Sequence, residues 1–392
     1  MKSTARLFNR HFILLFFSLL TLCFCHGMVC IELPLYLTDA GYGTTAAGYL
    51  TAAFAVVAML SRVFGGRLTD RFPKTAVVAA GCLLYALGCA LFPAFSGIGF
   101  LLLFRMINGM GYSAATTASY AACADVCPQE RVGEGIAYFG IAQNIASAFS
   151  AMLLLAILRR WGYPVSFRAS AAAGGIAALC ALAARCRTGA AAPKAEKKKF
   201  SIRDYYEKSA LPVGLTMFIV NLGFGIIGMY LTLFAVGRGY ANPGLFFTIS
   251  TVVMMVTKAA AGRVGERVPS MAIIVGCSLI GAVGMLLIAL VDSEPVFYFA
   301  GVLYGLGSGA NISRLDAEVY RRAPASRRGA ATGTYMFFAD LSFGASGLLW
   351  GSLMDVLPHE TVFLLCAAVL AASAFAAPVL LRGGKTAEAV KE

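Results

Sequence analysis

The feature that most constrains this chain is a series of hydrophobic runs, each long enough to cross a lipid bilayer. A helix rises 1.5 Å per residue, so roughly 20 apolar residues span about 30 Å of hydrocarbon. The runs are long and continuous and lack the two-residue alternation that is typical of membrane barrel strands. We predict an all-α integral membrane protein with twelve transmembrane helices, at residues 12–37, 44–66, 75–94, 98–122, 132–158, 164–185, 209–235, 244–262, 271–291, 295–318, 329–353 and 360–381.

The composition excludes a water-soluble globule. Of the 392 residues, 59% are hydrophobic and only 13% are charged, which leaves too few polar side chains to cover a soluble fold. Lys2, Arg6 and Arg10 before the first run would suit a cleaved signal peptide, but that run is too long and eleven more follow it. The 11 cysteines lie in or at the ends of runs without C-x-x-C spacing, so we expect no metal or disulfide framework.

The distribution of basic residues predicts the orientation in the membrane. Lys and Arg concentrate in cytoplasmic loops, and a cytoplasmic N-terminus places most of the 32 Lys and Arg residues on that side. The exceptions lie in or beside external loops or within helices: Arg159, Arg160, Arg168, Arg238, Arg62, Arg105, Lys258 and Arg314. The net charge of +13 is therefore read as a topology signal, not as a sign of nucleic-acid binding.

The chain contains an internal repeat at an offset of 196 positions. The segment from Gly66 to Pro73 matches the segment from Gly262 to Pro269, and the same offset relates Gly109 to Gly305, Gly111 to Gly307, Pro128 to Pro324 and Arg131 to Arg327. An even number of helices separates the copies, so the halves are parallel repeats. We predict an N-terminal six-helix bundle at residues 1–186, a basic cytoplasmic linker at 187–207 and a C-terminal six-helix bundle at 208–392, with both termini cytoplasmic.

Two motifs give the chain a resemblance to a known family. Gly66-Arg67-Leu68-Thr69-Asp70-Arg71-Phe72-Pro73-Lys74 resembles the signature loop of the major facilitator superfamily, with Pro73 in place of a glycine. Arg105-Met106-Ile107-Asn108-Gly109-Met110-Gly111 resembles the R-x-x-x-G-x-G motif of proton-driven members, and the segment from Ala124 to Arg131 resembles the end of that helix in efflux members. The fifth helix lacks the G-P-x-x-G-G motif of drug antiporters. The resemblance implies two six-helix bundles, alternating access and a plasma-membrane location.

Charged residues at membrane depth are costly and are therefore candidates for coupling and substrate binding. Glu32 and Arg105 have similar depths, and we predict that they pair across the first and fourth helices. The alternatives are a purely structural ion pair, or a Glu32 side chain that reaches the external surface. Asp340 lies near the middle of the eleventh helix, where it would serve as a proton carrier or as a helix-packing hydrogen-bond partner.

The tenth helix carries a group of charges near its predicted cytoplasmic end. Arg314 and Glu318 are four residues apart and so share a helix face, with Asp316 between them. We expect this set to extend toward the cytoplasmic surface. The alternative is that Arg314 contacts an anionic group of the substrate.

The signature loop predicts a charge network at the cytoplasmic ends of the helices. Its members stabilise one access state and separate in the other; they are Gly66, Asp70, Arg71, Lys74, Asp125 and Arg131. The second-half equivalents are Glu266, Arg267 and Arg321, with Glu266 pairing with Arg321 in reversed polarity. The alternative reading is that these are ordinary charges at the membrane surface.

These features predict a secondary active transporter that exports a small amphiphilic compound, drug or metabolite by proton antiport. Proton-coupled uptake or uniport of a small organic solute is the alternative, and a non-transporting membrane sensor is the alternative from another class. The absence of H-E-x-x-H, G-x-S-x-G and a nucleotide-binding P-loop argues against an enzyme or an ATP-driven pump. We expect no cofactor beyond the proton gradient, a small-molecule substrate, protons and membrane lipid as partners, no nucleic acid, and function as a monomer.

Overall fold

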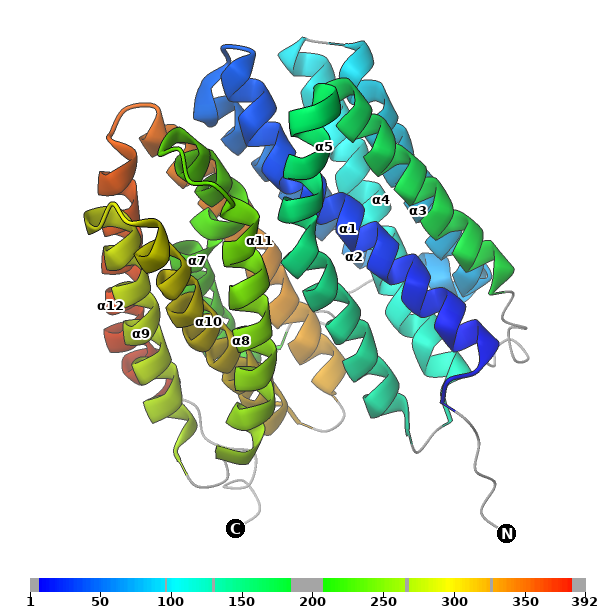
Figure 1. Ribbon diagram of the computed structural model, residues 1–392. Coiled ribbons are helices and arrows are strands. Elements are labelled where there is room, and N and C mark those ends of the chain that lie inside the picture. Colours follow the sequence, from blue (N-terminus) through cyan, green and yellow to red (C-terminus); the bar gives the residue numbers. More distant parts are fainter. Residues whose placement is uncertain are drawn as a thin grey trace, which may run out of the picture. The chain divides into compact units, whose positions relative to one another are not determined.

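The computed structural model describes residues 7–95, 97–128, 131–184, 207–264, 268–324 and 327–382, and within these ranges the side chains of residues 63–71 and a few others are not described. Every regular element among the described residues is helical (Figure 1). The helices are α1 (Arg10–Asp39), α2 (Gly43–Arg71), α3 (Lys74–Leu91), η1 (Phe92–Ala94), α4 (Ile98–Val126), α5 (Val132–Ala183), η3 (Lys208–Ala210), α7 (Leu211–Gly237), α8 (Pro243–Val264), α9 (Ser270–Leu290), α10 (Glu294–Arg322), α11 (Arg328–Met354) and α12 (His359–Arg382).

The long element α5 consists of two helical segments that meet at Gly162. This glycine has φ 73° and ψ 179°, a backbone conformation outside the helix that L side chains rarely adopt. Gly162 lies between the predicted fifth and sixth hydrophobic runs, so the backbone breaks where the sequence predicts a short loop.

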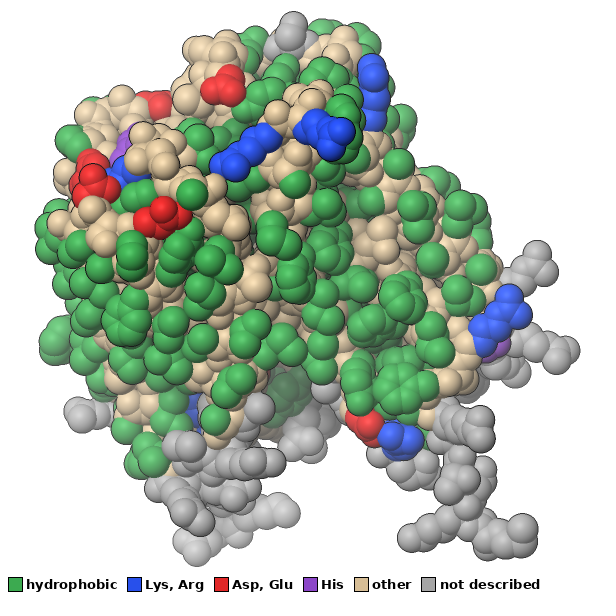
Figure 2. All heavy atoms as spheres, in the orientation of Figure 1, with side chains coloured by type: hydrophobic (Ala, Val, Ile, Leu, Met, Phe, Trp, Pro, Cys, Tyr) green, Lys and Arg blue, Asp and Glu red, His purple; other side chains and the backbone are tan. Residues whose placement is uncertain are grey.

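Eight helical stretches among the described residues are long and apolar enough to cross a membrane. The all-α prediction is therefore confirmed, whereas the count of twelve spans and the orientation of the termini stay predictions. A ninth apolar stretch, Pro243–Lys258 in α8, is shorter. On the face shown in Figure 2, hydrophobic side chains cover the middles of the helices and charged side chains gather near their ends. Large apolar side chains such as Phe375, 75% exposed, are suited to contact with lipid.

The chain divides into two compact units. The first comprises Met1–Gly41 and Tyr49–Glu196, and the second comprises Tyr42–Gly48 and Lys197–Glu392. In the first unit α1 packs on α5, and α3 packs on α4 and α5. In the second unit α9 packs on α10 and α12, α7 packs on α11 and α12, and α8 packs on α10. The predicted domain boundaries stay a prediction, because nearly all of the predicted linker, residues 187–207, lies outside the described residues.

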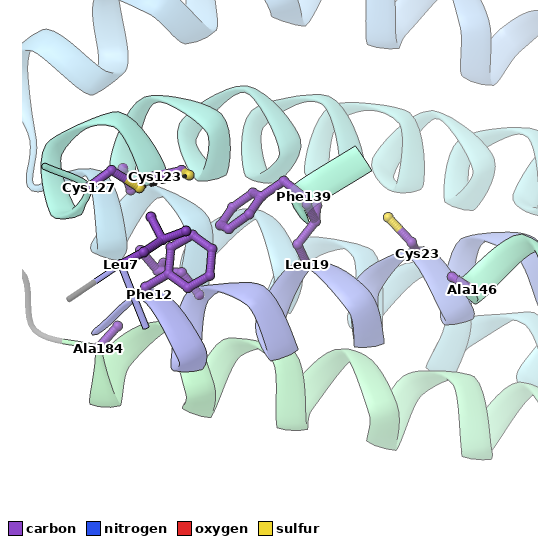
Figure 3. Packing of buried hydrophobic residues seen from close by; sticks show 11 residues of the cluster. Leu7, Phe12, Leu19, Cys23, Cys123, Cys127, Phe139, Ala146 and Ala184 are labelled. Carbon is purple, nitrogen blue, oxygen red and sulfur yellow. Dashed lines mark hydrogen bonds between the residues drawn. The ribbon is translucent and has the colours of Figure 1, made fainter. Parts of the chain in front are cut away.

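A cluster of buried side chains joins α1, α4 and α5 in the first unit (Figure 3). Phe12 and Leu19 of α1 pack near Phe139 of α5, and all three are at most 1% exposed. Cys123 of α4 and Cys127, which directly follows α4, belong to the same cluster. Their Sγ atoms are 3.8 Å apart and form no disulfide. These cysteines act as small apolar side chains.

The internal repeat is visible in the contacts of glycine backbones. A Cβ at Gly109 would meet the Phe54 carbonyl oxygen at 2.6 Å, and one at Gly305 would meet the Ser250 carbonyl oxygen even closer. Ser250 follows Phe54 by the same 196 positions. The glycines of α4 and α10 thus allow close helix packing in both halves.

The neighbouring glycines behave in the same way. A Cβ at Gly111 would lie 2.5 Å from the Gly81 carbonyl oxygen, and one at Gly307 would lie 2.8 Å from the Cys277 carbonyl oxygen. Cys277 again follows Gly81 by 196 positions. In each half, two neighbouring helices therefore pack closely on these glycines through backbone atoms: α2 and α3 on α4, and α8 and α9 on α10.

Candidate functional site

Glu32 and Arg105 are both buried but do not form the predicted ion pair. Glu32 on α1 is 0% exposed and Arg105 on α4 is 1% exposed. Neither carboxyl oxygen of Glu32 has a hydrogen-bond partner, and neither do Nε and Nη1 of Arg105. The predicted pairing is therefore wrong for this structure. The alternative of Glu32 at the external surface is wrong as well, because its side chain is fully buried.

Two other groups hold the Arg105 guanidinium. Its Cζ lies 4.3 Å from the centre of the Phe54 ring of α2, which is the geometry of a cation–π contact. Its Nη2 donates to the Cys30 Sγ at 3.4 Å. An aromatic face and a sulfur thus compete with Glu32 for the guanidinium, and residue depth alone could not predict this choice.

His26 of α1 lies in a cluster of planar groups, which we call the His26 cluster: Arg105, Phe54, His26 and Tyr112. The His26 ring lies nearly parallel to Phe54, with centroids 5.0 Å apart, and to Tyr112, with centroids 4.1 Å apart. The Tyr85 hydroxyl lies 3.5 Å from Nδ1 of His26. His26 was not among the predicted site residues, although any histidine within a hydrophobic run is a candidate for function.

Glu32 has one polar neighbour from the bent element α5. The Ser166 hydroxyl is near the Glu32 carboxyl group, but no hydrogen bond joins them, and the hydroxyl is itself buried without a partner. An ionised carboxylate in such surroundings is strongly destabilised unless it gains a partner. The site therefore contains a carboxyl group and a guanidinium in one bundle, each with unused hydrogen-bonding capacity.

Arg314 and Glu318, near the end of α10, are buried, so the prediction that they extend to the surface is wrong for these two residues; Asp316 between them is partly exposed. Arg314 is 7% exposed and Glu318 is 3% exposed. Glu318 accepts hydrogen bonds from Arg321 at 2.7 Å and Arg322 at 2.6 Å, and Arg322 also donates to the Leu381 carbonyl of α12. Glu318 thus pairs with the arginines three and four residues after it. Nε of Arg314 has no hydrogen-bond partner.

The predicted cytoplasmic network is seen in part. Nζ of Lys74, at the start of α3, lies 2.6 Å from a carboxylate oxygen of Asp125, near the end of α4. Arg131 instead pairs with Glu134 on its own helix at 2.7 Å. Gly66, Asp70 and Arg71 lie in the last turns of α2, where side chains are not described.

The second-half residues of that network are largely outside the described part. Glu266 and Arg267 fall in the undescribed segment between α8 and α9. Arg321, the predicted partner of Glu266, forms a salt bridge with Glu318. Asp340 is half-buried on α11 and takes part in an interaction with neighbouring groups, and its role stays a prediction.

The beginning of α2 is capped by a carboxylate within the second unit. Asp355, directly after α11, accepts hydrogen bonds at 2.7 Å from the backbone N–H groups of Thr44 and Thr45 and from the Thr44 hydroxyl. The first N–H groups of a helix have no partner within the helix, so a carboxylate there satisfies them and complements the helix dipole. We call Asp355, Thr44 and Thr45 the α2 cap.

Close backbone packing surrounds the α2 cap. A Cβ at Gly48 would lie 2.7 Å from the Gly347 carbonyl oxygen, and one at Gly351 would lie 2.6 Å from the Thr44 carbonyl oxygen. The Tyr230 hydroxyl of α7 donates to the Gly347 carbonyl at 2.8 Å. The sequence offers no local signal for the α2 cap, because Thr44 and Asp355 are 311 positions apart.

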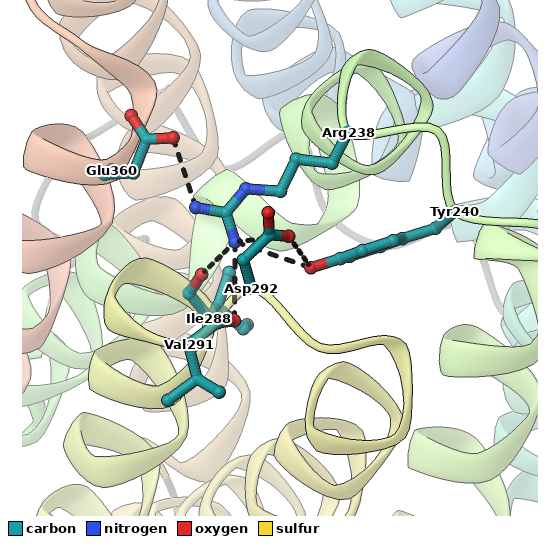
Figure 4. A network of polar contacts seen from close by, with 6 residues as sticks. All are labelled: Arg238, Tyr240, Ile288, Val291, Asp292 and Glu360. Atoms are coloured by element: carbon teal, nitrogen blue, oxygen red, sulfur yellow. Dashed lines mark hydrogen bonds and ion pairs between the residues drawn. The ribbon is translucent and has the colours of Figure 1, made fainter.

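Arg238 connects three helix ends in the second unit (Figure 4). It follows α7 and donates to Glu360 of α12 at 3.1 Å and to the carbonyls of Ile288 and Val291 at the end of α9 at 3.3 and 3.4 Å. Its guanidinium also lies 4.4 Å from the centre of the Phe234 ring. Figure 4 shows Tyr240 and Asp292 approaching it from the opposite side.

Arg238→Ala should destabilise the second unit, because it leaves Glu360 and two helix-terminal carbonyls without their donor. The expected loss is about 1 to 3 kcal/mol, measured as a lower melting temperature of the purified protein in detergent. Arg168→Ala is the matched control, since Arg168 is exposed on α5. Equal melting temperatures for the two variants would contradict a structural role for Arg238.

The sequence comparison decides the family. The sequence model of the Major Facilitator Superfamily matches residues 15–347. The chain belongs to this superfamily. Its members are transporters, and the resemblance read from the signature loop and from the Arg105 motif is confirmed.

Individual relatives of this superfamily member differ in how much of the chain they cover. The MFS-type transporter YhhS of Escherichia coli K12 is 28% identical over 355 residues, which cover 88% of this chain and 86% of YhhS. The quinolone resistance protein NorA of Staphylococcus aureus is 29% identical over 136 residues, 35% of each chain. A crystal structure of the nucleoside transporter NupG has a TM-score of 0.80 at 14% identity and covers 95% of this chain and all of NupG. The last similarity establishes the fold alone.

Proposed function

We propose that this superfamily member is a secondary active transporter of the plasma membrane that exports a small amphiphilic compound in exchange for protons. The observation that carries the proposal is Glu32, a fully buried carboxyl group without a hydrogen-bond partner, in the same bundle as the incompletely partnered Arg105. The similarity to NorA, a quinolone resistance protein, supports export as the direction.

The arrangement explains how one proton could be coupled to a conformational change. A protonated Glu32 is neutral and needs no counter-charge in its apolar surroundings. An ionised Glu32 requires a partner, and Arg105 has two unused donors to offer. Loss of the proton therefore favours a second arrangement in which the two residues meet, and a substrate that prefers one arrangement shifts the equilibrium.

In this proposal the Lys74–Asp125 salt bridge acts as a gate that is closed in one access state and open in the other. It joins the start of α3 to the end of α4 at 2.6 Å, and both side chains are partly exposed. A partly exposed ion pair contributes little energy, so it can form in one access state and separate in the other at small cost. The proton gradient drives the cycle in this scheme, without a cofactor, and the chain acts as a monomer.

The test of coupling is proton movement in everted membrane vesicles that are loaded with acid and monitored with a pH-sensitive dye. For the wild type, addition of a transported compound from a panel of amphiphilic cations and small metabolites should alkalinise the vesicle interior. Glu32→Gln should reduce this signal at least about tenfold, because the amide cannot exchange a proton. Glu134→Gln, at a glutamate with 42% of its side chain exposed, is the matched control.

The outcome separates the competing functions. Full alkalinisation in Glu32→Gln would overturn Glu32 as the coupling residue. Substrate accumulation that needs an inward proton gradient, or no gradient at all, would favour uptake or uniport. Binding of a compound without any flux would favour a sensor.

A further inference from the structure

Two arginines and a tryptophan follow one another directly before the break in α5. Arg159 and Arg160 are exposed, and Trp161 is 55% exposed. Cζ of Arg160 lies 5.1 Å from the centre of the Trp161 ring, so the guanidinium and the indole form a cation–π contact. We call these three residues the α5 turn patch.

The chain that follows the break is fixed to α1, which holds the α5 turn patch at the surface. Gly162 ends the first helical segment with its φ of 73°. The Tyr163 hydroxyl donates to the Asp39 carboxylate, at the end of α1, at 2.6 Å. The Tyr163 ring also packs edge-on against the Tyr36 ring, with centroids 5.3 Å apart. The turn is therefore anchored on one side of Gly162, and the patch lies exposed on the other side.

The basic charge of the patch is not a feature that both halves of the protein share. The offset of 196 positions relates the stretch from Arg159 to Trp161 to the stretch from Asp355 to Leu357. The second-half turn thus carries a negative charge, and Asp355 uses that charge inside the protein as the α2 cap. In contrast, no carboxylate among the described side chains forms a salt bridge with Arg160.

The length of the helix places the patch at the level of lipid headgroups. The segment from Val132 to Trp161 is roughly 45 Å long at 1.5 Å per residue, whereas the hydrocarbon layer is about 30 Å thick. The end of this segment therefore reaches the headgroup layer, where tryptophan is enriched in membrane proteins. A guanidinium binds phosphate oxygens through two parallel hydrogen bonds, so arginines at this level suit a phospholipid.

We propose that the α5 turn patch binds the headgroup of an anionic phospholipid such as phosphatidylglycerol. Arg159 and Arg160 contact the phosphate, and Trp161 lies beside the glycerol and the upper part of the acyl chains. The net negative charge of the lipid matters, because the two arginines together carry more positive charge than one phosphate neutralises. This interaction does not rest on the proposed transport function, since it involves neither Glu32 nor Arg105.

Quenching of tryptophan fluorescence by brominated lipid measures lipid binding at the patch directly. The chain has two tryptophans, and Trp350 is only 2% exposed. The full-length protein is reconstituted into mixed bilayers of phosphatidylcholine and phosphatidylglycerol, in which one lipid at a time is brominated near the glycerol end of its acyl chains. The difference between the wild type and Trp161→Phe isolates the signal of Trp161. Phosphatidylglycerol should be preferred there at least about fivefold, because one arginine near an anionic headgroup contributes about this factor.

The double variant Arg159→Gln/Arg160→Gln, compared with the same variant carrying Trp161→Phe, should lower this preference to about one. Arg10→Gln is the control, because Arg10 is exposed at the opposite end of α1 and should not affect the patch. Equal quenching by the two lipids in the wild type, or a preference that survives in the double variant, would overturn the proposal. Inorganic phosphate should leave the preference unchanged relative to chloride at the same ionic strength. If phosphate abolished it, the patch would be a site for free phosphate instead of lipid, and the proposal would be wrong.

Discussion

Gly111→Ala should destabilise the protein by about 3 kcal/mol, whereas the same substitution at a helix glycine with open space around its Cβ position is stabilising. The added Cβ would lie 2.5 Å from the Gly81 carbonyl oxygen and 2.7 Å from the Tyr85 backbone nitrogen. Backbone atoms cannot turn away as a flexible side chain can, so α3 and α4 must separate. For a chain of 392 residues, a loss of this size corresponds to a melting temperature lower by roughly 4 °C.

The control for this prediction is Gly175→Ala on α5. Nothing lies within 4 Å of the Cβ position at Gly175, so alanine should stabilise by up to about 1 kcal/mol through its higher helix propensity. The two variants therefore differ in sign, which makes the comparison insensitive to detergent conditions. A melting temperature for Gly111→Ala equal to that of Gly175→Ala would show that the α3–α4 contact is looser than described.

Asp355→Ala should release the first turn of α2. The variant loses three hydrogen bonds of 2.7 Å to Thr44 and Thr45, and loss of a helix N-cap costs about 1 to 2 kcal/mol. Amide hydrogen exchange of the Thr44–Thr45 region, followed by mass spectrometry, should accelerate by about tenfold. Asp292→Ala is the control, since Asp292 contacts Tyr240 and Arg238 instead.

The α2 cap also predicts how amide hydrogen exchange at Thr44 and Thr45 depends on pH. Partial burial raises the pKa of Asp355, but the hydrogen bonds from Thr44 and Thr45 outweigh it, so the pKa lies below its ordinary value of 3.8. A lowered pKa means that the stabilisation is present above pH 3.8 and is lost as the pH falls further. After correction for intrinsic exchange rates, the protection of this turn should stay constant from pH 8 to 5. A marked loss of protection near pH 6 would contradict the cap.

The sequence predicts the helices well because each depends on a local pattern. Pro73 and Pro269, 196 positions apart, precede α3 and α9 as predicted by the repeat, since proline cannot continue a preceding helix. The lysine of the signature loop, Lys74, reaches Asp125 as expected because both lie at helix ends on one side of the bundle.

The sequence predicts the site less well because side-chain partners depend on competition in three dimensions. Glu32 and Arg105 have compatible depths, but depth does not reveal that Phe54 and Cys30 lie nearer to the guanidinium. Helical spacing pairs Arg314 with Glu318, yet Arg321 and Arg322 have the same reach and take the carboxylate. The α2 cap joins residues without any shared local pattern, so only the folded chain reveals it.

The glycine contacts bear on how the two halves could diverge after duplication of a six-helix ancestor. In each of these contacts the glycine lies against a backbone carbonyl oxygen, and every amino acid carries a backbone carbonyl group. Phe54 and Ser250 therefore fill equivalent places although their side chains share nothing, as do Gly81 and Cys277. Such a crossing requires the glycine and makes no demand on the side chain of its partner. An ancient symmetry can thus persist in the backbone after most of its trace in the side chains has been erased.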